Sequence, residues 1–100
     1  MRTANVFVND KEAGQLKEHD FGKKYSFEYF SEYNGDPVSI TMPVTQSRYE
    51  FKSFPPFFDG LLPEGFMLEG LLKNTNINPD DYFSQLVAVG GNLVGAVTVE

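Results

Sequence analysis

Residues 54–72 combine prolines, glycines and aromatic residues more densely than any other part of the chain. Three prolines, four phenylalanines and three glycines fall within these nineteen positions. Because proline fixes φ and glycine permits positive φ, the segment cannot form one regular element. We expect a series of short turns followed, from Glu64, by a helix. The first three phenylalanines, Phe54, Phe57 and Phe58, are expected to anchor these turns in a hydrophobic core.

Alternating apolar and polar residues predict several β-strands before this segment. Residues 4–8 and 11–18 are predicted to form a hairpin, because residues 9–11, Asn-Asp-Lys, favour a turn. Residues 21–30 form the clearest strand pattern, and residues 38–42 alternate again before a proline. The aromatic residues that share one face of the 21–30 strand are Tyr25, Phe27 and Tyr29.

Two helices and a last strand complete the predicted fold. The first helix covers residues 64–73. The second begins at residues 78–81, Asn-Pro-Asp-Asp, with Asn78 as the predicted N-cap, and ends at Gly90-Gly91. The valine-rich residues 93–99 are predicted to form a strand. We therefore expect a single α+β domain over residues 1–100, with a small, mostly antiparallel sheet and two main helices.

The composition limits what such a domain can bind. The formal net charge is −6 and the eight lysine and arginine residues are scattered, so we expect no direct binding to nucleic acid. The chain has no cysteine, which excludes disulfides and thiolate metal sites and fits a reducing compartment. It has no signal-like start and no apolar stretch of roughly 18 residues, so we expect a cytoplasmic protein without a membrane span.

Phe66 is the candidate contact residue of the predicted 64–73 helix. At about 100° per residue, four apolar side chains cluster on one face, which we expect to lie in the core. These side chains are Met67, Leu68, Leu71 and Leu72. Phe66 falls on the opposite side with Glu69, and Gly65 and Gly70 leave its ring uncovered, which is typical of a contact anchor. The alternative is that Phe66 folds back beneath the proline-rich turn.

No pattern in the chain points to catalysis, a metal or a cofactor. Asp59 and Glu64 are two nearby carboxylates, but nothing brings them into one cleft, and we expect them to cap short helices. His19 is the only histidine and lies in a polar sequence that predicts a solvated turn. No serine has a G-x-S-x-G setting. The glycines of residues 90–95 match no nucleotide-binding motif, and we expect them to end a helix and let a strand approach its neighbour.

Two sequence blocks resemble the N-terminal subdomain of HipA-type toxin kinases. Residues 56–65, Pro-Phe-Phe-Asp-Gly-Leu-Leu-Pro-Glu-Gly, are similar to the FFDNLLPEG signature of that subdomain. Residues 81–90, together with residues 94–97, are similar to its closing helix and strand. Residues 6–9 and 39–44 also fit in order, so the resemblance spans nearly the whole chain.

The resemblance implies a protein that binds another protein. These 100 residues contain no His-Arg-Asp-like catalytic loop, no Asp-Phe-Gly-like metal site and no nucleotide-binding lysine, so we expect no enzyme activity. A free-standing copy of the subdomain resembles the HipS antitoxins of tripartite HipBST systems. That likeness implies neutralisation of a HipT-like serine/threonine kinase, with a HipB-like DNA-binding protein in a ternary complex. The alternative is a structural subunit of a split HipA-type kinase without an inhibitory role.

The residues expected to contact the kinase lie at the end of the signature block and just after it. They are Pro63, Glu64, Gly65, Phe66 and Glu69. We expect them to dock on the small lobe of the kinase, near its nucleotide site.

Overall fold

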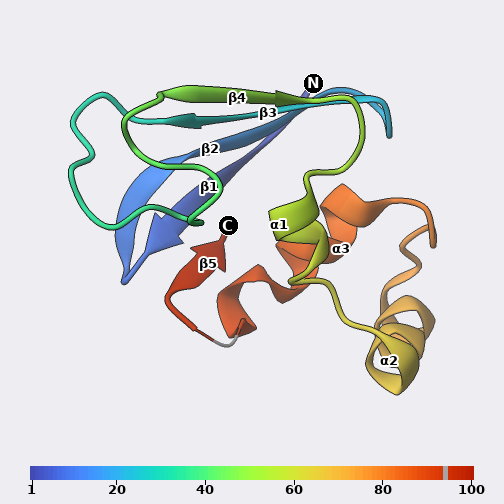
Figure 1. The fold of residues 1–100 in the computed structure, drawn as a ribbon. Coiled ribbons are helices and arrows are strands. Elements are labelled where there is room, and N and C mark those ends of the chain that lie inside the picture. The colour runs from blue at the N-terminus through green and yellow to red at the C-terminus, as the bar shows by residue number, and fades with distance from the viewer. Residues whose placement is uncertain (94) are drawn as a thin grey trace.

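The computed structural model describes residues 1–93 and 95–100. In these residues, five antiparallel strands form one sheet in the order β4-β3-β2-β1-β5, and the helices lie on one side of it (Figure 1). The strands are β1 (Arg2–Val8), β2 (Lys11–Asp20), β3 (Lys24–Tyr29), β4 (Arg48–Phe51) and β5 (Val97–Val99). The helices are α1 (Pro56–Asp59), α2 (Gly65–Thr75), α3 (Tyr82–Val89) and the 3-10 helix η1 (Gly90–Asn92). The predicted α+β class, antiparallel sheet and two main helices are confirmed; the short α1 was not predicted.

The β1–β2 hairpin turns at Asn9 and Asp10. Both residues have positive φ, 50° and 66°, and Val8 pairs with Lys11 across the turn. A two-residue turn with both φ angles positive matches the twist of the flanking strands, and Asn and Asp tolerate that conformation better than most residues. The predicted hairpin is confirmed, with Lys11 as the first residue of β2 rather than part of the turn.

The aromatic face of β3 packs against the helical side of the molecule. The Tyr25 ring meets Phe54 edge-on at a centroid distance of 5.4 Å, and the centroids of Phe27 and Phe58 are 5.9 Å apart. Phe58 of α1 and Leu86 of α3 are both completely buried in the same cluster. The prediction that Phe54 and Phe58 fill the core is confirmed, and Phe57 packs against the core while partly buried.

The long loop between β3 and β4 covers the other end of this face. The Tyr29 hydroxyl donates a hydrogen bond to the Met42 carbonyl (2.5 Å) and accepts one from the Val38 amide (2.9 Å). Val38 and Met42 are buried against the core. The prediction of a strand over residues 38–42 is wrong: only an isolated bridge between Ser39 and Met42 forms. The apolar ends of this segment face the core, but a turn closes between them.

A charged network joins β1 to α3. The Arg2 guanidinium donates to the Glu18 carboxylate (2.8 Å), to both oxygens of Asp81 (2.8 and 3.1 Å) and to the Ser84 hydroxyl (2.8 Å). Tyr25 donates to the second oxygen of Glu18 (2.9 Å). Burial, with a smaller contribution from Glu18, raises the pKa of Tyr25 to about 12. The planar fork of arginine suits this bidentate pairing, and the network fixes α3 against the first strand.

Asp81 is the N-cap of α3. Its side chain accepts a hydrogen bond from the Ser84 backbone amide (3.1 Å). The prediction that Asn78 caps this helix is wrong, because Asn78 forms a separate turn in which its side chain accepts from the Asp80 amide (2.8 Å). Both side chains satisfy local amides, as expected for Asx residues, but only Asp81 opens the helix.

Gly90 lets β5 pass close to the end of α3. A Cβ atom at Gly90 would lie 2.0 Å from the Val99 carbonyl oxygen. The predicted role of this glycine is therefore confirmed. The last strand is shorter than predicted, Val97–Val99 rather than residues 93–99, and position 94 lies outside the described residues.

We expect Gly90→Ala to lower the free energy of unfolding by about 1–3 kcal/mol, because the added methyl group forces backbone atoms apart. Gly91→Ala is the matched control, since no atom lies within 4 Å of a Cβ at that position. Urea unfolding of both variants measures the difference. Equal stability of the two variants would contradict the close approach.

The Arg2–Asp81 pair predicts a stability difference that depends on pH. Burial alone would raise the pKa of the Asp81 carboxyl, but hydrogen bonds from Arg2 and Ser84 outweigh burial and lower it from 3.8 to about 2. A carboxyl whose pKa is lower in the folded state stabilises the protein above its ordinary pKa. That stabilisation is lost as the pH falls through the folded-state pKa.

Asp81→Asn keeps a good N-cap residue and removes the charge. We expect this variant to be about 1 kcal/mol less stable than the parent at pH 7. The difference should disappear between about pH 4 and pH 2. Asp80→Asn removes an exposed carboxylate that makes no contact with Arg2 and serves as the control. Urea unfolding of the parent and both variants at several pH values measures these differences. A difference between the parent and Asp81→Asn that does not change with pH would contradict the prediction.

Candidate partner-binding surface

Helix α2 projects from the molecule instead of covering the sheet. An extended connection after α1 leads to it, and Figure 1 shows it apart from the sheet and the other helices. None of its side chains is fully buried. Its last residue is followed by Asn76 in the left-handed conformation (φ 58°), which ends the helix. A helix usually gains most of its stability from packing an apolar face, so α2 has an apolar surface that remains available for contact.

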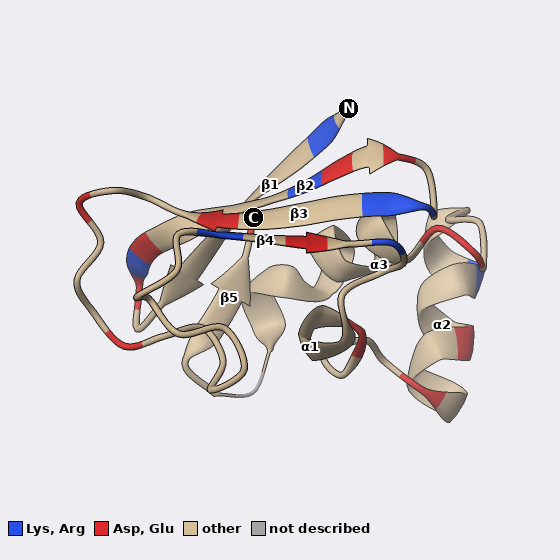
Figure 2. Ribbon diagram, turned by 45° about the horizontal axis from the view of Figure 1, so that its top comes forward, with Lys and Arg blue, Asp and Glu red and all other residues tan. Residues whose placement is uncertain are grey.

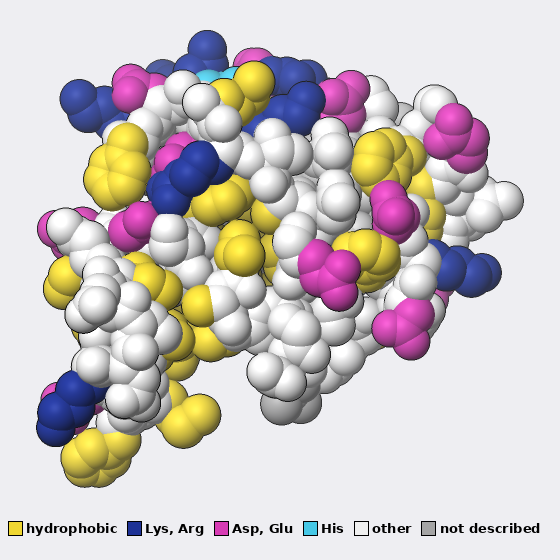
Figure 3. Space-filling model, turned by 180° about the vertical axis from the view of Figure 1, so that it is seen from behind, with side chains coloured by type: hydrophobic (Ala, Val, Ile, Leu, Met, Phe, Trp, Pro, Cys, Tyr) yellow, Lys and Arg dark blue, Asp and Glu magenta, His cyan; other side chains and the backbone are white. Residues whose placement is uncertain are grey.

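Phe66 and Met67 form the exposed apolar end of α2. Phe66 is 91% exposed and Met67 is 75% exposed. Hydrophobic side chains protrude at this end of the molecule in Figure 3, at the lower left. The alternative in which Phe66 folds back under the proline-rich turn is excluded by this exposure.

The prediction that one face of α2 lies in the core is only partly correct. Leu68, Leu71 and Leu72 are half-buried, whereas Met67 lies open to solvent. The periodicity correctly separated a more covered side from Phe66. It could not show that the covered side meets too little of the protein to become fully buried.

The residues before Phe66 set the direction of α2. Glu64 is extended (φ −131°, ψ 163°) and Gly65 has a positive φ of 57°. Positive φ is strained for residues with a side chain, so Gly65 allows the chain to turn at this point from the extended segment into the helix. Glu64 occupies the N-cap position, but its side chain accepts no capping hydrogen bond, so its predicted capping role is wrong.

The five predicted contact residues lie close together in the chain, at the start of α2 and just before it. Pro63 is half-buried, and Glu64, Gly65, Phe66 and Glu69 are exposed. The arrangement resembles a binding hot spot, an aromatic side chain with polar neighbours around it.

An apolar groove beside α2 was not anticipated from the sequence. We call it the α2 groove. It has a volume of about 480 Å³, and its lining comes from two stretches of the chain: Gly60, Leu61, Pro63 and Met67, and Ala88, Val89, Asn92 and Leu93. These two stretches are about 25 residues apart in the chain, and no local pattern predicts that they will meet.

The candidate catalytic residues do not form a site. His19 lies in β2, not in a turn as predicted, and its Nε2 atom is 2.7 Å from the Ser26 hydroxyl of β3. No third group completes a triad there among the hydrogen bonds of the described residues. Within residues 1–93 and 95–100, no group of His, Cys, Asp or Glu side chains could hold a metal ion. No described helix is both long and apolar enough to cross a membrane.

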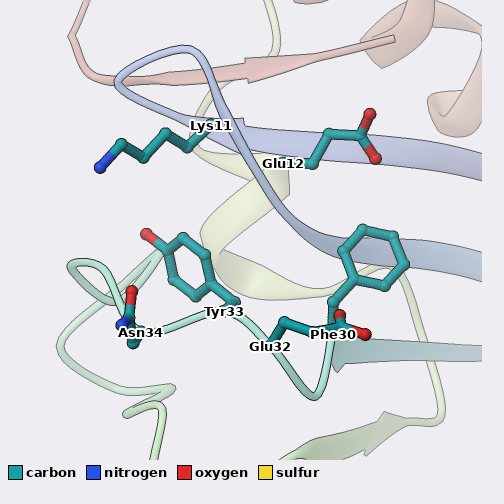
Figure 4. A pocket seen from close by; sticks show the side chains of 6 residues that line it. All are labelled: Lys11, Glu12, Phe30, Glu32, Tyr33 and Asn34. Carbon is teal, nitrogen blue, oxygen red and sulfur yellow. The ribbon is translucent and has the colours of Figure 1, made fainter.

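A second cavity, of about 420 Å³, lies where the β1–β2 hairpin approaches the loop after β3. Its lining side chains belong to Lys11, Glu12, Phe30, Glu32, Tyr33 and Asn34. In Figure 4 the Lys11 ammonium and the Glu12 carboxylate point in opposite directions. The charged groups therefore do not converge on a common point, as a reacting or strongly bound ligand would require.

Comparisons with known proteins agree with this architecture. The family model of the HipA N-terminal domain matches residues 4–100. A solved structure, the N-terminal domain of HipA toxin, superposes with a TM-score of 0.76 at 30% identity, covering all of this chain and 93% of the other.

Two sequence relatives differ in size. An uncharacterized protein of Haemophilus influenzae is 31% identical over 100 residues, which are 92% of its length. The "Putative kinase Y4mE" of Sinorhizobium fredii is 28% identical, and the match covers 24% of that protein. The family resemblance predicted from residues 56–65 and 81–90 is thus confirmed. The chain belongs to the HipA N-terminal domain family.

Proposed function

We propose that this chain is a non-catalytic antitoxin that binds and neutralises a HipT-like serine/threonine kinase. It docks on the small lobe of the kinase, near the nucleotide site, through Pro63, Glu64, Gly65, Phe66 and Glu69. The observation that carries the proposal is the nearly complete exposure of Phe66 on a helix with no fully buried side chain.

Burial of Phe66 in a partner supplies binding energy. Transfer of a phenylalanine side chain from water to an apolar site contributes about 1.5–3 kcal/mol. Because Phe66 lies in the first turn of α2, its ring is presented on a regular element and less freedom is lost on binding. The exposed Glu64 and Glu69 surround it with a polar rim.

The proposed mechanism is steric. Kinases must close their two lobes around the nucleotide to align the phosphoryl group. The Phe66 end of α2 inserts near the nucleotide site and holds the lobes apart. This mechanism requires no chemistry from the antitoxin.

The proposed complex is cytoplasmic and contains a HipB-like DNA-binding protein. Residues 53–100 carry six acidic side chains and one basic side chain, so this part of the chain is unsuited to direct contact with DNA. DNA binding in the complex therefore falls to the partner. No cofactor is needed for this function.

A second candidate function is that of a structural subunit of a split HipA-type kinase. The match to one quarter of a kinase-like relative favours it. Co-expression with the kinase separates the two functions: an antitoxin restores growth of the host cells, whereas a structural subunit leaves toxicity unchanged or increases it.

We expect Phe66→Ala to weaken binding to the kinase by about 2 kcal/mol or more, about 30-fold, because it removes the anchor side chain. Ile40→Ala is the control: Ile40 is 94% exposed but lies in the β3–β4 loop, away from α2. Its dissociation constant should remain within about twofold of the parent. Titration calorimetry with purified kinase measures both. Unchanged affinity and unchanged growth rescue for Phe66→Ala would overturn the proposal.

A further inference from the structure

On the basis of the function proposed above, we propose that the α2 groove receives an apolar side chain of the same kinase. This side chain is carried on a segment with neighbouring lysine or arginine residues. Binding is then reciprocal, with Phe66 entering the partner and a partner side chain entering the groove.

The lining of the groove selects an apolar group. Of the residues that form it, only Asn92 has a polar side chain, and none is charged. Its volume of about 480 Å³ lies within the range of about 300–1,000 Å³ typical of small-molecule pockets, which leaves room for a leucine or an aromatic ring. A charged group without a partner would lose hydration there without compensation.

The groove is continuous with the proposed anchor. Met67 lines the groove and directly follows Phe66 in the chain. Because Met67 is 75% exposed, a partner surface that covers Phe66 also meets the mouth of the groove. One docking event can therefore cover both sides of the start of α2.

The charges near the start of α2 identify the character of the partner. Asp59, Glu64 and Glu69 are exposed on α1, before α2 and on α2. None of them forms an ion pair with a described residue. The only basic residue of residues 53–100 is Lys73, and in Figure 2 most of the blue lysine and arginine segments lie on the sheet. Electrostatic complementarity therefore favours a basic partner segment.

The same charges disfavour a second copy of this chain as the occupant. Two copies that meet through their α2 grooves would bring Asp59 and Glu64 of one copy close to the same carboxylates of the other, which opposes association. A partner with basic residues beside an apolar side chain satisfies both the lining and the rim.

Cysteine labelling tests the occupancy of the groove. The chain has no native cysteine, so Ala88→Cys introduces a single thiol on the groove wall, at an exposed position. Reaction of the folded variant with N-benzylmaleimide attaches an apolar benzyl group at the lining of the groove. Val87→Cys is the matched control, because Val87 is 40% exposed on the same helix and does not line the groove.

We expect labelled Ala88→Cys to bind the kinase about tenfold or more weakly than the unlabelled variant. Labelled Val87→Cys should bind within about twofold of its unlabelled form. Unchanged affinity after labelling at position 88, with the parent still bound to the kinase, would overturn the groove proposal and leave the proposed function intact. Failure of the parent to bind the kinase would instead overturn the proposed function.

A salt titration tests the basic character of the partner segment. The affinity of the parent should fall as NaCl rises from about 50 to about 500 mM. The double variant Glu64→Gln, Glu69→Gln should bind more weakly at low salt and depend less on salt. Glu50→Gln, an exposed carboxylate on β4, should behave as the parent does. An affinity of the parent that does not change with salt would overturn the basic partner segment.

Discussion

Packing of Phe58 against Phe27 determines the arrangement of the helical half of the molecule. Phe27 lies on the buried face of β3, and Phe58 is completely buried over it with a centroid distance of 5.9 Å. This contact keeps the four-residue α1 at the sheet. Helices α1 and α3 cover the aromatic face, and the β3–β4 loop covers its other end, so α2 does not pack on this face. The helix is directed outward by Gly65 and its apolar side chains remain accessible.

A domain that leaves one helix unburied gives up stabilisation that a partner can provide. Charged and backbone constraints fix the parts that carry α2: Arg2 joins β1 to α3 through Asp81, and Gly90 allows β5 to approach. These contacts hold the elements next to α2 and the α2 groove in place. The binding residues therefore need not reorganise greatly when a partner covers them. The proposed antitoxin function uses this division between a stable sheet and an incompletely packed helix.

Local sequence patterns predicted the elements better than their packing. The hairpin at Asn9-Asp10, the strand containing Phe27 and helix α2 follow from turn chemistry and periodicity, and the exposure of Phe66 follows from its place opposite the leucines. The failed predictions depend on tertiary structure. Residues 38–42 alternate like a strand, but their ends are held by Tyr29. Met67 belongs to an apolar stripe that is only partly covered. The α2 groove unites segments that are distant in sequence, so no local pattern could reveal it.

Hydrogen–deuterium exchange of this chain with and without the kinase tests the central claim most directly. Binding through α2 and the residue before it predicts slower exchange of the backbone amides of residues 64–75. It also predicts slower exchange near Ala88, where the kinase covers the α2 groove. The amides of β4, at the far edge of the sheet, should exchange as in the free protein. Slower exchange confined to β4 or to the outer face of the sheet, with α2 unchanged, would show that the kinase binds elsewhere.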